Sequence, residues 1–252
     1  MKMSLLNRFL PGITIVVALL IWEFSTRYFG IKEFILPAPS VVLATAVTIA
    51  PELMRNMWAT LSVLLVGYGL GVVLGIALAV LMIILPPVRR ALYPLVVMSQ
   101  TIPKIAIAPL LILWFGVGPE PKVFIIALLA FFPVLVNTVA GLEGTDRGHL
   151  ELMRSVNANL WKVYRHVRLP AAVPQIFAGL KLALTVSVIG AVVGEWVVGN
   201  QGLGYLLLAY NSSLLTANVF ATLLLIILIS AVLFYSITRI ERVFSWRARL
   251  DS

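Results

Sequence analysis

The sequence predicts an all-α polytopic membrane protein with about six transmembrane helices. Hydrophobic residues make up 61% of the chain and charged residues only 12%, and the mean hydropathy is +1.05. A soluble domain usually carries about 25% charged residues, so this chain has too few to cover a water-exposed surface. Its apolar runs are continuous rather than alternating, which argues against a transmembrane β-barrel. Residues 1–252 are expected to form one membrane domain.

The apolar runs place the spans along the chain. We expect them over about residues 10–29, 58–85, 92–115, 122–140, 173–198 and 219–237, with a polar loop over 141–172. The first run resembles a signal peptide, but it is long for one, Glu23 interrupts it, and no convincing small-residue cleavage site follows. An uncleaved first span is therefore the preferred interpretation.

Residues 30–57 contain turn signals and polar side chains rather than a span. Two prolines disfavour a helical conformation in the residues that precede them, and Ser40 is then a candidate cap for a helix over about residues 41–56. Because that helix ends in polar residues, we expect it along the outer membrane surface. These residues are Glu52, Arg55 and Asn56.

Gly67, Gly71 and Gly75 form two overlapping G-x-x-x-G units in the second span. Small residues four positions apart line one face of a helix, and they let a neighbouring helix approach closely. We therefore expect helix packing, rather than ligand binding, at these three positions.

The third span carries the clearest signs of a polar pathway. Pro94, Pro103 and Pro109 interrupt it, and Lys104 lies near its middle. A proline inside a span frees backbone groups that need protein or water partners, and a charge at mid-depth usually faces a cavity. Residues 99–109 are therefore candidates to line a pathway. The alternative is a lysine that snorkels to an interface from a tilted helix.

Three more polar residues are candidates for the same pathway: Gln100, Asn137 and Glu195. Glu195 lies near the outer end of the fifth span, and no positive residue is close to it in the sequence. It either lines a pathway or gate, or belongs to a solvated helix end.

Residues 151–170 form a polar, basic island between two long apolar regions. Apolar residues at helical spacing predict short helices here, and Asn157 is the expected bend because Asn tolerates the left-handed conformation. Leu169-Pro170 is expected to stop the second helix before the chain re-enters the membrane. From the residues alone, the island is either a docking knob for a partner or a positive loop on lipid headgroups.

Lys and Arg are distributed unequally between the two sides of this arrangement. Thirteen lie in segments assigned to the inside, two lie within spans, and four lie outside or at outer helix ends: Arg27, Lys32, Arg55 and Lys122. Such a bias sets orientation, so both termini and the 141–172 loop are expected in the cytoplasm. The net charge of +9 then indicates contact with anionic lipid, and no nucleic-acid partner is expected.

The island resembles the signature of permease subunits of bacterial ABC importers. That signature reads Glu-Ala-Ala, three residues, Gly, nine residues, Ile, one residue and Leu-Pro. The corresponding residues here are Glu151-Leu152-Met153, Asn157, Val167 and Leu169-Pro170. Glu, Leu and Pro match the signature, whereas two alanines, the glycine and the isoleucine are replaced. Asn157 retains the capacity for a left-handed bend, whereas the larger Leu152 and Met153 depart from the packing on the partner that the signature implies.

Further segments resemble the branch of these permeases that imports nitrate, taurine and alkyl sulfonates, and thiamine-precursor pyrimidines. The resemblance covers most of the chain, from Leu36-Pro37-Ala38-Pro39-Ser40 to the last span. Its main segments are residues 108–116, 131–133 with Asn137-Thr138, 179–184 and 202–205. Residues 99–137 and Gly194-Glu195-Trp196 are slightly more similar to permeases for pyrimidine thiamine precursors or riboflavin.

This resemblance implies the type I ABC importer permease fold in a bacterial cytoplasmic (inner) membrane. The implied partners are a second copy of the permease, two cytoplasmic ATPase subunits that bind ATP and Mg, and an extracytoplasmic binding protein. The solute would be an anion such as sulfonate, taurine, nitrate or bicarbonate, or a thiamine-precursor pyrimidine. The residues implied in ATPase coupling are Glu151, Leu152, Met153, Arg154, Asn157, Leu169 and Pro170.

Features that the sequence lacks agree with this division of labour. There is no G-x-x-x-x-G-K-[ST] phosphate loop, so ATP is expected to bind elsewhere. With no Cys, and with the two histidines in or next to the island, neither a metal site nor a bound cofactor is expected, and no Ser/His/Asp set suggests an enzyme. The alternatives are an ATPase-independent secondary transporter or channel, for which no internal repeat is evident, and an integral-membrane enzyme.

Overall fold

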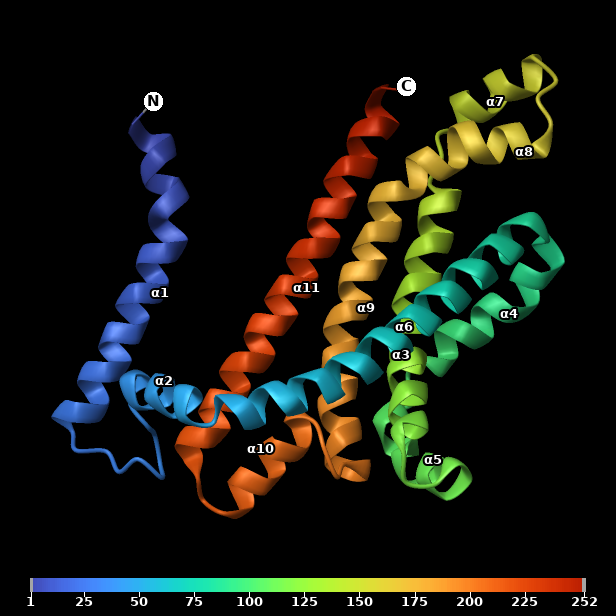
Figure 1. Cartoon of the computed structure of the whole chain (residues 1–252). Coiled ribbons are helices and arrows are strands. Elements are labelled where there is room, and N and C mark those ends of the chain that lie inside the picture. Colours follow the sequence, from blue (N-terminus) through green and yellow to red (C-terminus); the bar gives the residue numbers. More distant parts are fainter. Residues whose placement is uncertain (1, 251–252) are drawn as a thin grey trace.

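The computed structural model is all-helical over the residues it describes and confirms the predicted fold class (Figure 1). It describes residues 2–250, without the side chains of 2–9, 11, 147, 154, 160 and 245–250. The helical elements are α1 (Lys2–Tyr28), α2 (Pro39–Thr48), α3 (Ala50–Ile84), α4 (Pro86–Ser99), η1 (Lys104–Ile107), α5 (Ala108–Phe115), α6 (Pro119–Glu143), α7 (Arg147–Ser155), α8 (Leu160–Val163), η2 (Tyr164–Arg168), α9 (Leu169–Val198), α10 (Leu203–Ser212) and α11 (Thr216–Leu250).

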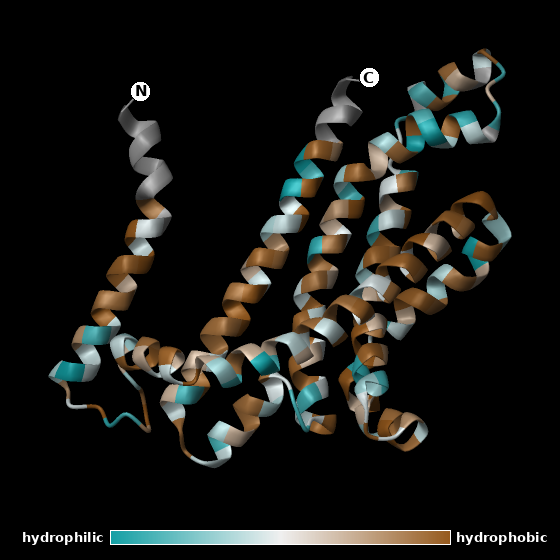
Figure 2. Ribbon diagram, viewed as in Figure 1, coloured by the Kyte–Doolittle hydropathy of each residue, from teal (hydrophilic) through white to brown (hydrophobic). Residues whose placement is uncertain are grey.

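Within the described residues, four helices are long and apolar enough to cross a membrane, or five if one bent pair counts as a span. They are α3, α6, the helix from Trp161 to Val198, and α11. Three predicted spans, 122–140, 173–198 and 219–237, lie inside such helices, and the predicted span 10–29 overlaps the 27-residue α1. Figure 2 shows mostly hydrophobic residues along α3 and α11 and hydrophilic residues on α7 and α8.

The third predicted span, 92–115, is interrupted in the structure, as its prolines indicated. α4 and the segment formed by η1 and α5 meet at an angle of 86°. Pro103 lies in the break between them. Proline has no N–H to donate, and it disfavours the helical conformation in the residue before it. Pro109 does not add a second break because it lies in the first turn of α5, where N–H groups have no partner within the helix.

The surface helix expected over residues 41–56 is also wrong. α2 ends at Thr48 and α3 begins at Ala50, so the polar residues of this segment belong to the first turns of the second long helix. Ser40 is not a helix cap. Its hydroxyl and its backbone N–H instead donate to the Glu23 carboxylate at 2.8 and 3.0 Å, which joins α2 to α1.

The core of the molecule is the packing of α3 and α9 against α6. α3 runs obliquely across these helices (Figure 1), and its glycine face touches α6. A Cβ added to Gly67 would lie 2.7 Å from the Cβ of Ile126, and one added to Gly71 would lie 2.5 Å from the carbonyl oxygen of Ala127. Gly75 faces the same helix. Approach this close leaves no room for a side chain, which is the reason for the small residues at this spacing.

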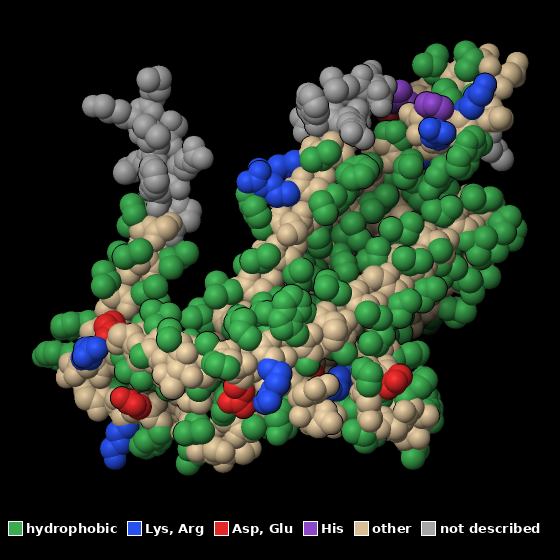
Figure 3. All heavy atoms as spheres, in the orientation of Figure 1, with side chains coloured by type: hydrophobic (Ala, Val, Ile, Leu, Met, Phe, Trp, Pro, Cys, Tyr) green, Lys and Arg blue, Asp and Glu red, His purple; other side chains and the backbone are tan. Residues whose placement is uncertain are grey.

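The two ends of the molecule differ in structure and charge. The N-terminal end of α1, the C-terminal end of α11 and the α7–α8 segment lie at one end, which we call the hairpin end; α10 and α5 lie at the other, the α10 end (Figure 1). On the face shown in Figure 3, Lys, Arg and His side chains gather near the hairpin end, whereas both charge signs are present at the α10 end.

Candidate functional site

The α7–α8 hairpin, residues 147–168, extends beyond the neighbouring ends of α3 and α6 (Figure 1). Two polar side chains stabilise the starts of its helices. The Asp146 carboxylate accepts the N–H of Gly148 at 2.7 Å. The Asn159 Oδ1 accepts the N–H of Lys162 at 2.9 Å. These bonds satisfy N–H groups that have no partner within the helix, so the hairpin carries its own local structure.

The bend between α7 and α8 is at Asn157. Its φ angle is 50°, which lies in the left-handed region and confirms the predicted conformation. The N–H of Ala158 donates to the carbonyl oxygen of Met153 at 2.9 Å, which closes the end of α7. The chain therefore reverses direction at a residue type that is suited to the left-handed conformation.

The expectation that Leu169-Pro170 stops the second helix of the hairpin is wrong. α8 passes through the π-helical turn η2 into α9, and the helix runs unbroken from Trp161 to Val198. A π-helical turn shifts the hydrogen-bond register just ahead of Pro170, so the missing proline N–H does not interrupt the helix. As a result, α8, the second helix of the hairpin, and the membrane span α9 are parts of one continuous helix.

Apolar side chains are exposed on this otherwise polar hairpin. Leu152 is 63% exposed, Val156 65% and Trp161 65%. Glu151 is also exposed, whereas Met153 is half-buried. The side chain of Arg154, another predicted coupling residue, lies outside the described residues. Large apolar side chains that protrude beyond the membrane spans are typical of a protein-interaction surface.

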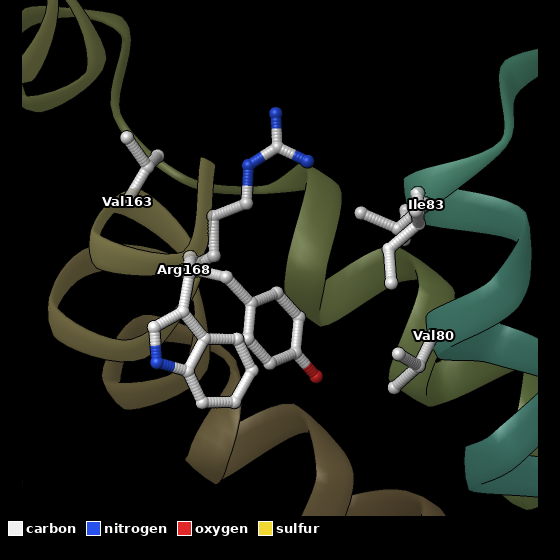
Figure 4. A pocket seen from close by; sticks show the side chains of 7 residues that line it. Val80, Ile83, Val163 and Arg168 are labelled. Carbon is white, nitrogen blue, oxygen red and sulfur yellow. The ribbon is translucent and has the colours of Figure 1, made fainter. Parts of the chain in front are cut away.

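A groove of about 300 Å³ separates the hairpin from the end of α3. Val80 and Ile83 line it from α3, and Val163 and Arg168 line it from the hairpin (Figure 4). Because this groove intervenes, the second helix of the hairpin is not packed tightly on α3 at this point. Its firmest connection to the membrane part is the unbroken helix into α9.

The predicted pathway residues fall into three separate places. Lys104 and Gln100 lie together at the break after α4, where the Lys104 ammonium donates to the Gln100 carbonyl oxygen at 3.3 Å and lies 4.5 Å from the centre of the Phe132 ring. Asn137 lies on α6 and accepts the Gln175 side-chain N–H at 3.1 Å. Glu195 lies at the α10 end. The structure therefore does not unite these residues in one site within a single chain.

Glu195 is 1% exposed, so the alternative of a solvated helix end is wrong. Its carboxylate accepts the Thr60 hydroxyl at 2.8 Å and the N–H of Gly204 at 2.7 Å. Thr60 in turn accepts the N–H of Leu203, and Asn56 accepts that of Gly202, each at 2.8 Å. Three side chains thus satisfy three backbone N–H groups at the start of α10, and we call them the α10 anchor.

Several members of this region were missed by the sequence analysis. Asn56 and Thr60 belong to α3, far from Glu195 in the chain, and Lys122 is buried at the start of α6. Tyr210 joins α10 to α3 as well, since its hydroxyl donates to the Glu52 carboxylate at 2.8 Å. Burial, together with this hydrogen bond, raises the pKa of Tyr210 to about 12. The sequence signal that could have identified them is the spacing of Asn56 and Thr60, two polar residues four positions apart near the start of an apolar helix.

A family model described as a binding-protein-dependent transport system inner membrane component matches residues 71–250. The chain belongs to this family. It is 36% identical to the formylaminopyrimidine transport permease protein ThiX of Halalkalibacterium halodurans, over 95% of this chain and 96% of that protein. It is 34% identical to the riboflavin transport system permease protein RibX of Chloroflexus aurantiacus, over 94% and 89%. The taurine transport system permease protein TauC of Escherichia coli is 29% identical, over 91% and 86%.

Solved structures show the same fold. An inward-facing form of the MetNI methionine ABC transporter matches with a TM-score of 0.68 at 22% identity, over 78% of this permease and 98% of that chain. An amino acid ABC transporter solved with histidines matches with a TM-score of 0.63 at 20% identity, over 81% and 97%. The chain is therefore a membrane-embedded ABC importer permease with the type I fold, as the resemblance in the sequence indicated.

Proposed function

We propose that two copies of this permease form a solute pathway and that the α7–α8 hairpin couples it to two cytoplasmic ATPase subunits, which bind ATP and Mg. The family membership supports the role of a subunit in an ATP-driven importer. The observation that carries the coupling role is the protruding hairpin with its exposed Leu152, Val156 and Trp161 side chains. These side chains are suited to a hydrophobic groove on a partner.

The continuous helix supplies a physical route for coupling. A displacement of α8, the second helix of the hairpin, by the ATPase moves the start of α9, because no break separates α8 from α9. α9 packs along α6 and carries Glu195 at its far end. ATP binding changes the shape of the permease only if the ATP-bound ATPase has different affinities for the two conformations of the permease. We expect this difference in affinity to arise from the contacts that the ATPase makes with the hairpin.

The charge distribution supports an orientation with the hairpin end and both termini in the cytoplasm. Lys, Arg and His side chains gather near this end (Figure 3), and positively charged segments are retained on the cytoplasmic side of a bacterial inner membrane. The α10 end would then face the extracytoplasmic binding protein that delivers the solute.

For the solute, we propose a thiamine-precursor pyrimidine or a related heteroaromatic compound. Relatives named for formylaminopyrimidine and riboflavin transport share 36% and 34% identity with this chain. Relatives named for taurine and nitrate share 29% and 28%. The ligand that co-purifies with the cognate binding protein tests this choice, and an oxyanion such as a sulfonate in that protein would overturn it.

The coupling role is tested by co-purification and by uptake into proteoliposomes that contain the permease, its ATPase and the binding protein. Glu151→Lys, or deletion of residues 149–158, is expected to abolish ATPase association and ATP-driven uptake. Glu33→Lys is the matched control, because Glu33 is an exposed carboxylate in the loop between α1 and α2. Uptake by the purified permease without any ATPase would instead favour a secondary transporter or channel.

A further inference from the structure

A polar cavity of about 380 Å³ lies at the α10 end, between α3, the start of α6 and the segment that follows α9. This volume lies within the range of small-molecule sites. Five polar side chains contribute to its lining: Ser62, Lys122, Glu195, Asn200 and Gln201. Both a donor and an acceptor of hydrogen bonds are therefore available along its wall.

The side chain of Lys122 is the feature that indicates a ligand site in this cavity. The residue is only 5% exposed. Among the described residues, its ammonium has neither a hydrogen bond nor an ion pair, although the charge of Glu195 acts on it from a longer distance. A buried ammonium with its donors unused is unfavourable, and within a membrane protein such a charge usually faces a polar pathway. Its side chain is therefore available to a molecule in the cavity.

Glu195 balances the charge of Lys122 but does not accept a hydrogen bond from its ammonium group. Both carboxylate oxygens of Glu195 already accept hydrogen bonds within the α10 anchor. Lys122 and Glu195 are the two charged residues of the lining, so the cavity carries no net charge. An anion would add an uncompensated negative charge close to Glu195, whereas a neutral polar molecule leaves the balance intact.

We propose that this cavity is an outer subsite for the solute and that it selects a neutral, polar heterocycle or amide. A carbonyl oxygen or ring nitrogen of the solute accepts a hydrogen bond from the Lys122 ammonium. The amide groups of Asn200 and Gln201 supply further donors and acceptors at the same cavity. This subsite rests on the function proposed above, and it narrows the solute class by disfavouring anions such as alkyl sulfonates and nitrate.

Equilibrium binding of radiolabelled formylaminopyrimidine to the permease–ATPase complex in detergent tests the subsite. Lys122→Met is expected to weaken binding about 10- to 100-fold, because a charge-assisted hydrogen bond is lost. Lys122→Gln keeps an N–H donor without the charge, and it is expected to weaken binding by about three- to tenfold, less than Lys122→Met. Lys32→Met is the matched control, since Lys32 is an exposed lysine outside the cavity and leaves the affinity unchanged. An anionic alkyl sulfonate is expected not to compete.

Three results contradict the subsite. Unchanged binding in Lys122→Met, or no binding to the wild-type complex, indicates a cavity filled by water alone. Equal losses in the Met and Gln variants, or competition by an anionic alkyl sulfonate, indicate an anion site. Loss of folded complex in both variants indicates that Lys122 serves only as a counter-charge for Glu195. Binding without ATP-driven uptake by the wild-type proteoliposomes leaves the subsite standing and overturns the proposed function.

Discussion

Polar residues stabilise both the hairpin end and the α10 end of this permease, but these residues come from one continuous stretch in the hairpin and from separate helices at the α10 end. The α7–α8 hairpin is built from one continuous stretch, and its helices are capped by Asp146 and Asn159 from within or next to that stretch. The α10 anchor joins Asn56 and Thr60 of α3 to Glu195 of α9. The hairpin is exposed, whereas the anchor is buried.

This difference separates two physical roles. Exposed hairpin side chains contribute little to the stability of the chain alone, because they gain little burial from folding. They remain available to a partner. The buried side chains of the anchor stabilise the fold directly, since each satisfies a polar group that water cannot reach. We therefore expect substitutions at the α10 end to affect folding and substitutions in the hairpin to affect association.

The largest expected effect on stability is at the α10 anchor. Glu195→Ala removes the acceptor of both the Thr60 hydroxyl and the Gly204 N–H, which should lower the free energy of unfolding by about 2–4 kcal/mol. The matched control at the hairpin end is Glu143→Ala, which breaks a half-exposed ion pair with Arg89 and should cost at most about 1 kcal/mol. Denaturant titration in detergent micelles measures both, and equal losses would contradict the comparison.

An intermediate effect is expected in the helix pair that connects the two ends. Gly71→Val places side-chain atoms against the backbone of α6 and should destabilise the permease by about 1–3 kcal/mol. Gly69→Val is the control, because a Cβ at Gly69 meets no atom within 4 Å. Thermal unfolding and the yield of folded protein distinguish the two variants. A similar loss for both would show that helix propensity, rather than the close approach of α3 and α6, governs this position.

The smallest effect on stability is expected in the hairpin. Asn157→Val forces a β-branched residue into the left-handed conformation and should cost about 1–2 kcal/mol, mostly as local opening of the hairpin. Asn157→Gly should be neutral or slightly stabilising in this region. Hydrogen exchange over residues 147–168 measures the local opening. An equal fall in protection at the α10 end would contradict the expectation that this substitution acts locally in the hairpin.

Patterns within one stretch of chain were predictable from the sequence. The membrane class, the apolar spans near residues 122–140 and 219–237, and the left-handed Asn157 all follow from local composition and conformational preference. The effect of a proline depended on its neighbouring turns. Pro103 interrupts the third span as expected, whereas Pro170 fails to end a helix because a π-helical turn precedes it.

The chain itself determined that this protein is a helical membrane protein with a basic polar segment that bends at Asn157, because hydropathy, charge bias and turn preference act over a few residues at a time. The α10 anchor and the cavity at Lys122 were decided by tertiary structure alone. Glu195 has no basic residue near it in the sequence, and only the packing of α3, α6 and α9 brings Thr60 and Lys122 to it. Burial then makes those contacts strong, and no local pattern encodes burial of that kind.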